Sequence, residues 1–234
     1  MPTIAEAEAQ IQADNRPVLF LDTCIYLDII RATDRCLDGC VRSGWELLAL
    51  LTAVPPQCTL VAASMIPTEW NDNAQKVQDE VNGKLKKIQE QAGMFHEACS
   101  ALGISLTFGR PVYSSVGLIE RLHDLSKELL ERSIILDEDA GCNSRGLNRV
   151  RRKIPPAERS TEAKDCVIVE EYLELTRQLH AKGFANKRVF CTSNKRDFGE
   201  SGGNNLHPTL AAEFDMIDLR FTTNLPHAVY ELTH

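Results

Sequence analysis

The sequence predicts an α/β fold in which helices cover both faces of a mostly parallel sheet. Short apolar runs of strand length alternate along the chain with longer segments of helical periodicity. Acidic residues follow several of these runs, which is typical of a ligand site at the carboxyl edge of an open α/β sheet. With 234 residues, 43% of them hydrophobic, the chain can bury a full core, so we expect residues 1–234 to form a single domain.

The first part of the chain is expected to hold two strands and their connecting helices. Residues 18–21 and about 59–63 are apolar runs of strand length. Apolar residues at 24–30 and 45–54 suit helices, and a pair of prolines stops the second of them. Pro67 favours the start of a further helix, because an early helical position does not need the missing N–H.

A long, charged helix is predicted for residues 75–102. Val, Leu, Ile, Ala and Phe recur there at steps of three or four residues, and Gly103 closes the segment. The pattern indicates an exposed amphipathic helix. Its apolar stripe could pack on the sheet or meet a second copy of the chain, so a homodimer is a candidate assembly.

The middle of the chain is predicted to be mainly helical. A short strand is a candidate at 104–108, and residues 116–136 have a helical pattern. Residues 145–153 are rich in arginine and run into two further prolines. This basic segment is interpreted as a loop or a helix end.

The last third of the chain is expected to complete the sheet. Ser160 is a good N-cap for a helix over about 161–179. Residues 188–192 form a third clear strand, and 216–221 is a candidate edge strand. Strands separated by helices in this order predict parallel pairing.

The charge balance disfavours one class of function. The 26 basic and 33 acidic residues give a net charge of −7, which argues against a protein that coats nucleic acid non-specifically. It is compatible with a nuclease, because bound divalent cations reverse the local potential of a carboxylate site. No long apolar run and no basic leader followed by an apolar segment is visible, so we expect a cytoplasmic protein without a membrane partner.

The eight cysteines are expected to be buried free thiols. The sequence contains no CxxC, and several cysteines lie inside apolar runs. A zinc site at Cys36 and Cys40 is disfavoured, because no second ligand pair has a suitable spacing.

Four acidic residues, each near the end of an apolar run or in a first helical turn, are candidates for one metal site: Asp22, Glu69, Asp165 and Asp197. Crowded carboxylates raise one another's pKa, and a bound divalent cation removes that penalty. Oxygen ligands without His or Cys suit Mg²⁺ or Mn²⁺, which can activate water and neutralise a phosphate. Phosphodiester hydrolysis at such a site needs no protein nucleophile.

The sequence around these acids resembles the PIN-domain ribonucleases. Four blocks in the family's order carry the resemblance. They are Leu-Asp-Thr-Cys-Ile-Tyr-Leu-Asp at 21–28, the lone Glu69, Ala-Lys-Asp-Cys-Val-Ile at 163–168 and Thr-Ser-Asn-Lys-Arg-Asp-Phe at 192–198. The resemblance implies that Asp22, Glu69, Asp165 and Asp197 are the catalytic metal ligands of an RNA endonuclease.

The resemblance also implies an architecture and supporting residues. The expected fold is a three-layer α/β/α sandwich with a core at about 17–221 and a helical insertion at about 71–150, as in larger bacterial PIN-like proteins. The residues expected to orient a carboxylate or a metal-bound water are Thr192, Ser193 and Asn194. The basic residues expected to contact RNA are Arg149, Arg152, Lys153 and Lys195.

Each of these residues also has a simpler structural explanation. Asp22 could cap the helix that follows it. Glu69 and Asp165 lie in first helical turns, where the helix dipole favours an acid without any metal. Asp197 and the polar residues before it could form an ordinary turn. The basic segment could be a solvated face, and Asp28 is expected to face solvent or form a salt bridge.

Several functions stay open at this point. The first is a Mg²⁺- or Mn²⁺-dependent endoribonuclease, toxin-like or acting in defence or processing, with RNA and an inhibitor protein as candidate partners. The second is a PIN-like module that binds nucleic acid or protein with little cleavage. A flap-type DNA nuclease would share the acidic site. A phosphatase of the haloacid dehalogenase type is disfavoured, because Cys24 stands where its second Asp would be.

Overall fold

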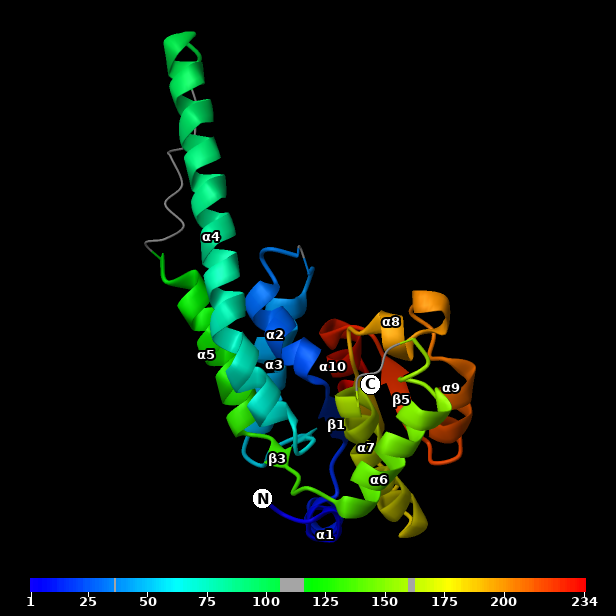
Figure 1. The fold of residues 1–234 in the computed structure, drawn as a ribbon. Helices are drawn as coiled ribbons and strands as arrows, with labels where there is room; N and C mark the ends of the chain where they lie inside the picture. Colours follow the sequence, from blue (N-terminus) through cyan, green and yellow to red (C-terminus); the bar gives the residue numbers. More distant parts are fainter. Residues whose placement is uncertain (36, 106–115, 160–162) are drawn as a thin grey trace.

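The computed structural model describes residues 1–35, 37–105, 116–159 and 163–234 (Figure 1). Within these residues the chain has an α/β fold with one five-stranded parallel sheet surrounded by helices, as the sequence predicts. The buried hydrophobic side chains form one continuous cluster, which draws on residues from Ile4 to Leu232.

The sheet has the strand order β3-β2-β1-β4-β5, and every neighbouring pair is parallel. The strands are β1 (Val18–Leu21), β2 (Thr59–Ala62), β3 (Ile134–Ile135), β4 (Arg188–Cys191) and β5 (Arg220–Thr222). All residues of β1, β2 and β4 are buried, which explains their continuous apolar runs. The expected strands at 18–21, 59–63, 188–192 and 216–221 are therefore confirmed to within a few residues at their ends.

The helices form the two outer layers of the three-layer fold (Figure 1). They are α1 (Ile4–Asp14), α2 (Thr23–Arg31), α3 (Cys40–Thr52), α4 (Ile66–Ala101), α5 (Leu118–Glu131), α6 (Ala140–Arg152), α7 (Ala163–Ala181), α8 (Lys195–Phe198), α9 (Pro208–Asp215) and α10 (Leu225–Thr233). A short 3₁₀ turn at Glu200–Gly202 follows α8.

Helix α7 is anchored to the centre of the sheet by Tyr172. The tyrosine ring packs on Phe20 of β1 and Phe190 of β4, with ring centroids 4.9 and 5.6 Å apart. Its hydroxyl donates to the Leu21 carbonyl at 2.7 Å and accepts from the Ala63 N–H at 2.9 Å. Both contacts lie at the carboxyl ends of their strands, so Tyr172 holds α7 beside the edge where a ligand is expected.

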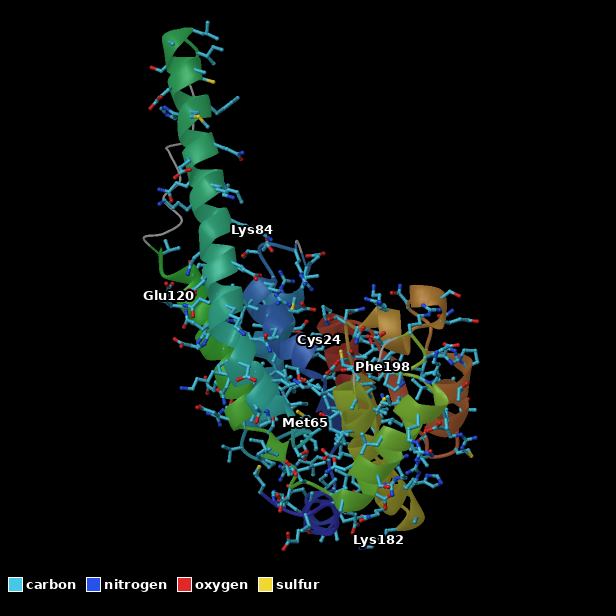
Figure 2. All side chains as sticks on the ribbon, in the orientation of Figure 1. Cys24, Met65, Lys84, Glu120, Lys182 and Phe198 are labelled. Atoms are coloured by element: carbon cyan, nitrogen blue, oxygen red, sulfur yellow. The ribbon has the colours of Figure 1, made fainter. Side chains whose placement is uncertain are left out.

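Helix α4 is one continuous helix of 36 residues. Its first turns pack on α2 and α5, and its outer half extends beyond the body of the molecule (Figures 1 and 2). The helix expected to begin at Pro67 and the helix expected over 75–102 are thus one element. Ile88, Met94 and Phe95 in the outer half are exposed, so among the described residues the predicted apolar stripe is covered mainly along the first half of α4.

One expectation for the middle of the chain is wrong, and another is confirmed in one of its two forms. The helix expected over 116–136 ends at Glu131, and Ile134–Ile135 instead pairs with β2 as an edge strand. Two adjacent β-branched residues favour a strand there. The basic segment 145–153 is not a loop. It forms the C-terminal part of α6 and its C-cap, so the helix-end interpretation is confirmed, and Asp139 caps the start of α6 by accepting from the Cys142 N–H at 2.7 Å. The expected insertion at 71–150 therefore contributes a strand to the sheet as well as helices.

Some expectations lie at the limits of the described residues. Ile104 and Ser105 are not in a strand, and the rest of the candidate strand at 104–108 is outside the described residues. The proposed N-cap Ser160 is outside them too. The sequence interpretation assigned no element to the N-terminus. There Thr3 and Glu6 form a capping box that starts α1.

Candidate functional site: a carboxylate network at the carboxyl edge

Asp22 both caps a helix and lies at the centre of the candidate site. It follows β1 directly, is only 4% exposed, and its Oδ1 accepts from the Thr23 N–H at the start of α2 at 2.7 Å. Its Oδ2 accepts from the Thr192 hydroxyl at 2.6 Å and from the Cys24 thiol at 3.1 Å. The capping explanation is therefore correct, and it leaves the second oxygen for the site.

The environment of Asp22 disfavours its charged form. Burial raises the pKa of its carboxyl, the hydrogen bonds from Thr192 and Cys24 oppose this shift, and the nearby charge of Glu69 raises the pKa further. A cation bound at this position would offset the repulsion between the carboxylates of Asp22 and Glu69.

Glu69 reaches the same site from the first turn of α4. Its Oε2 accepts from the Thr23 hydroxyl at 2.6 Å, and its Oε1 lies 3.4 Å from the Lys164 ammonium. Thr23 thus connects Glu69 of α4 to Asp22 at the end of β1, although the two acids are far apart in sequence. Lys164 precedes Asp165 in α7 and brings one positive charge to the acids.

Asn194 brings the other two acids together. Its side-chain amide donates to Oδ2 of Asp165 and to Oδ2 of Asp197, both at 3.0 Å. Its backbone N–H donates to the Thr192 hydroxyl at 3.0 Å, and its Oδ1 accepts from the Asp197 N–H at 3.3 Å as the cap of α8. Asn194 therefore joins this pair to Thr192 and, through it, to Asp22.

We call these connected groups the carboxylate network. Its members are Asp22, Thr23, Glu69, Asp165, Thr192, Asn194 and Asp197. They come from the ends of β1 and β4 and the first turns of α2, α4, α7 and α8, because parallel strands deliver their carboxyl ends to one edge of the sheet. Figure 2 labels Cys24 at the start of α2 and Phe198 at the end of α8, which mark two sides of this edge. The structure thus links all four predicted acids by hydrogen bonds.

The network contains oxygen ligands, but they are held apart in pairs. Among the described residues, no three His, Cys, Asp or Glu side chains are grouped closely enough to hold a metal ion. The amide of Asn194 separates one pair and the hydroxyl of Thr23 the other. Oδ1 of Asp197 is buried and accepts no hydrogen bond within the described part of the chain. This oxygen and the all-oxygen ligand set are suited to a hard divalent cation.

Residues not singled out from the sequence complete the network. Thr23 and Lys164 contact Glu69, and the Cys24 thiol accepts from the Ser193 N–H at 3.1 Å. Burial, followed by the charge of Asp22, raises the pKa of Cys24 well above its ordinary value, so this thiol stays protonated. All three lie inside the sequence blocks that predicted the acids, which is the signal that could have identified them.

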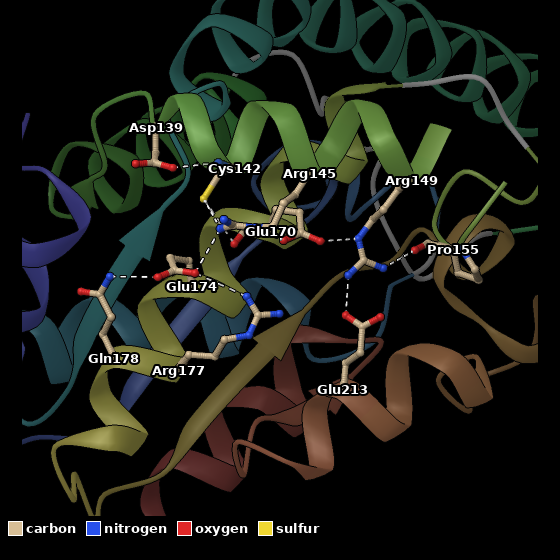
Figure 3. Close-up of polar contacts among 10 residues, drawn as sticks. All are labelled: Asp139, Cys142, Arg145, Arg149, Pro155, Glu170, Glu174, Arg177, Gln178 and Glu213. Atoms are coloured by element: carbon tan, nitrogen blue, oxygen red, sulfur yellow. Dashed lines mark hydrogen bonds and ion pairs between the residues drawn. The ribbon is translucent and has the colours of Figure 1, made fainter. Parts of the chain in front are cut away.

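The expected role of Arg149 as an RNA contact is wrong. Arg149 is 5% exposed and lies between α6, α7 and α9 (Figure 3). Its guanidinium donates to Glu170 at 2.6 Å, to the Pro155 carbonyl at 2.8 Å and to Glu213. With every side of the fork engaged, Arg149 is a structural residue.

The neighbouring arginine of the basic segment is also engaged in protein contacts. Arg145 donates to Glu170 at 2.8 Å and to Glu174 at 3.0 Å (Figure 3). The segment that was expected to be a solvated face or an RNA contact therefore ties α6 to α7, which starts at the site with Asp165.

Three of the expected RNA contacts are exposed. Arg152 and Lys153 lie at the C-terminal end of α6, and Lys195 is in α8, immediately after Asn194. Helices α6 and α7 run in opposite directions beside each other, so the end of α6 lies toward the start of α7 (Figure 1).

The expectation that Asp28 faces solvent or forms a salt bridge is confirmed in its second form. Oδ1 of Asp28 lies 3.0 Å from Nη1 of Arg35, and Asp28 is only 4% exposed. The described cysteines are all free thiols, and most are buried, as expected. Burial raises the pKa of Cys40, which lies near Asp28, to about 12.

Comparison of the chain with protein-family models, with curated proteins and with solved structures finds no match. Among the helices of the described residues, none combines the length and the apolar character that a membrane crossing requires. The resemblance to PIN-domain ribonucleases therefore rests on the sequence blocks.

Proposed function

We propose that this chain is a PIN-like endoribonuclease that hydrolyses RNA phosphodiester bonds with Mg²⁺ or Mn²⁺. The observation that supports the proposal is the carboxylate network, which connects four acids from distant parts of the chain at the carboxyl edge of a parallel sheet. Gathering buried acids is costly, and a fold retains such a cluster where a cation or a proton is to be held.

In this proposal Asp22, Glu69, Asp165 and Asp197 are the ligands of the cation. Bound there, Mg²⁺ or Mn²⁺ would lower the pKa of a water molecule and neutralise the phosphate. Thr192 and Thr23 hold the carboxylates of Asp22 and Glu69 in fixed directions through bonds of 2.6 Å. Such supporting hydrogen bonds orient metal ligands and tune their affinity.

Other residues of the chain have proposed roles in binding RNA. Lys164 is half exposed and close to Glu69, so its ammonium can pair with a phosphate oxygen at the site. Exposed Arg152, Lys153 and Lys195 can contact phosphates on either side of the cleaved bond. The free thiols favour a reducing cytoplasm. An inhibitor protein and a homodimer through α4 stay predictions.

One specific observation favours the alternative, a binding module with little cleavage. Asn194 and Lys164 already contact acids of the network, and the described residues hold no three-ligand group. In this alternative the network would stabilise the edge of the sheet, and RNA, DNA or a protein would bind without chemistry.

The experiment that separates these functions uses the purified full chain. End-labelled single-stranded RNA and DNA of one sequence are incubated with Mn²⁺, Mg²⁺ or EDTA, and the products are resolved by length. We expect cleavage of RNA at internal positions with either metal and none with EDTA. Mn²⁺ binding is measured separately by its paramagnetic resonance signal. Cleavage of DNA alone would support a flap-type nuclease, and binding without cleavage of either strand would support the binding module.

A further inference from the structure

A pocket of about 380 Å³ opens beside the carboxylate network. It is lined by residues of α2, of the segment between α2 and α3, and of the segments that follow β4 and β5. Ser193 and Lys195, which flank Asn194, form part of its wall. We call it the side pocket. Its volume lies within the range of roughly 300–1,000 Å³ that is usual for small-molecule sites.

The side pocket combines apolar surface with several polar and charged groups. Ile25, Leu37, Leu225 and Pro226 provide apolar surface on more than one side. Buried Asp28 also lines it, but Arg35 neutralises this acid at 3.0 Å. Apolar surface beside convergent polar groups is usual for a site that binds a small molecule such as a nucleobase.

Two polar groups on the rim define which ring fits. Asp38 is exposed and presents a carboxylate, which only accepts hydrogen bonds. Asn224 caps α10 by accepting from the His227 N–H at 2.9 Å through Oδ1, which leaves its amide nitrogen as a donor. A carboxylate is satisfied best by two adjacent N–H donors, and guanine presents such a pair, from N1 and N2, next to the O6 acceptor.

We propose that the side pocket binds one guanine base of the RNA strand, next to the phosphate that lies at the carboxylate network. The inference rests on the proposed RNA-cleaving function and names its sequence preference. Asp38 accepts from N1–H and N2–H of the base, Asn224 donates to O6, and Lys195 pairs with the adjoining phosphate. The base must leave the stack to enter, so the substrate is single-stranded at this position.

The test measures binding of mononucleotides, which does not depend on cleavage. GMP, AMP, CMP and UMP are titrated in EDTA into the full chain carrying labelled Ile and Leu methyl groups, with inorganic phosphate as the reference for the shared charge. We expect GMP to bind at least about tenfold more tightly than the others and to move the methyl signals of Ile25, Leu37 and Leu225. Equal binding of all four, stronger binding of another base, or shifts confined to distant methyl groups would overturn the proposal.

Conservative variants assign the contacts. Asp38→Asn should reduce the preference for GMP about tenfold, because an amide replaces one of the two acceptors by a donor. Asn224→Asp keeps the cap of α10 but turns the donor toward O6 into an acceptor, and it should weaken GMP binding more than AMP binding. The control is Asp215→Asn, an exposed Asp on α9 outside the pocket, which should leave all four affinities unchanged. An unchanged GMP preference in both pocket variants would contradict the assignment.

The two proposals fail in different ways. A GMP preference in a chain that cleaves no RNA would leave the guanine pocket standing and reject the nuclease. If the chain cleaves random single-stranded RNA but its cut ends show no enriched guanine beside the cleaved bond, the nuclease stands and the pocket inference is rejected.

Discussion

At the scale of single residues, two side chains of the site each have two structural roles, one for each of their polar atoms. One oxygen of Asp22 caps α2 and the other belongs to the carboxylate network. Asn194 likewise uses its oxygen to cap α8 and its nitrogen to join Asp165 to Asp197. Structure and site therefore use the same residues, and substitutions should be chosen that keep the capping function.

Asp22→Asn should nearly abolish RNA cleavage while the fold stays intact. Asparagine still caps a helix well, but it is a poor ligand for Mg²⁺ or Mn²⁺ because it carries no charge. Losing several kcal/mol of transition-state stabilisation corresponds to a rate lower by about a hundredfold to ten-thousandfold. Single-turnover cleavage of labelled RNA measures the rate, circular dichroism checks the fold, and Asp215→Asn is the matched control. A near-parental rate for Asp22→Asn would refute the catalytic assignment.

Asp165→Asn should lower the cleavage rate in the same way as Asp22→Asn.

The stability of the metal-free chain should depend on pH through Asp22. Burial raises the folded-state pKa of this acid, so its contribution to stability is full at low pH and is lost as the pH rises through that pKa. In EDTA, Asp22→Asn should melt no lower than the parent at neutral pH, and its advantage should shrink as the pH falls. Thermal melts of both proteins between about pH 5 and 8 measure the difference. If the difference in melting temperature between Asp22→Asn and the parent grew as the pH fell, the raised pKa of Asp22 would be contradicted.

At the scale of elements, the buried charges between α6, α7 and α9 decide how the start of α7 is held. Glu170 accepts from both Arg145 and Arg149, and Arg149 continues to Glu213 of α9 (Figure 3). Gly146 of α6 allows the close approach, because a Cβ there would lie 2.9 Å from the Val167 side chain of α7. The position of Asp165 thus depends on the packing of α6 against the first turns of α7.

Arg149→Met should destabilise the fold by about 3–5 kcal/mol, because it leaves a buried carboxylate without its partner. The remaining bond from Arg145 to Glu170 favours the lower end of this range. Arg151→Met is the control, since Arg151 is exposed on the same helix. Urea unfolding measures both variants, and equal midpoints would contradict the structural role of Arg149.

Substitutions at the exposed end of α6 should affect binding and not stability. Arg152→Gln combined with Lys153→Gln removes two exposed positive charges and should weaken RNA binding in EDTA. The slope of the logarithm of affinity against the logarithm of salt should fall by up to about 1.4 for single strands. Fluorescence anisotropy at several salt concentrations measures it. Unchanged affinity and slope would show that these two residues are solvated surface residues without a role in RNA binding.

At the scale of the whole molecule, the N-terminal helix completes the core. Ala7 and Ile11 of α1 are fully buried, and α1 packs on α7 at the end away from the site. Buried Glu8 of α1 also pairs with Lys182, just beyond α7. The outer half of the long α4, by contrast, exposes Ile88, Met94 and Phe95. Substitutions in α1 should therefore affect the stability of the fold more than substitutions in the outer half of α4.

Ile11→Ala should therefore destabilise the whole chain by about 2–5 kcal/mol, the usual cost of a cavity at a fully buried position. Ile88→Ala in the outer half of α4 is the control, because Ile88 is 48% exposed, and it should change stability by less than about 0.5 kcal/mol. Denaturant unfolding compares the two. A similar loss for Ile88→Ala would show that the outer half of α4 is covered in solution.

The sequence by itself determined the central strands, most helices and the gathering of the four acids. These features have local signals: buried parallel strands are continuous apolar runs, helices repeat every three or four residues, and residues that end parallel strands meet at one edge. For this reason Asp22 and Asp197 could be placed together from their positions alone.

Only the tertiary structure decided which polar residues are buried and which partners they contact. Arg149 and Arg152 look alike in sequence, but Arg149 meets Glu170 and Glu213 across two other helices and Arg152 meets solvent. Strand β3 exists because Ile134–Ile135 lies beside β2, and Asp28 is buried because Arg35 folds back onto it. Periodicity reports the exposure expected of a helix or strand on its own, whereas the burial of a charge depends on a partner supplied by a distant part of the chain.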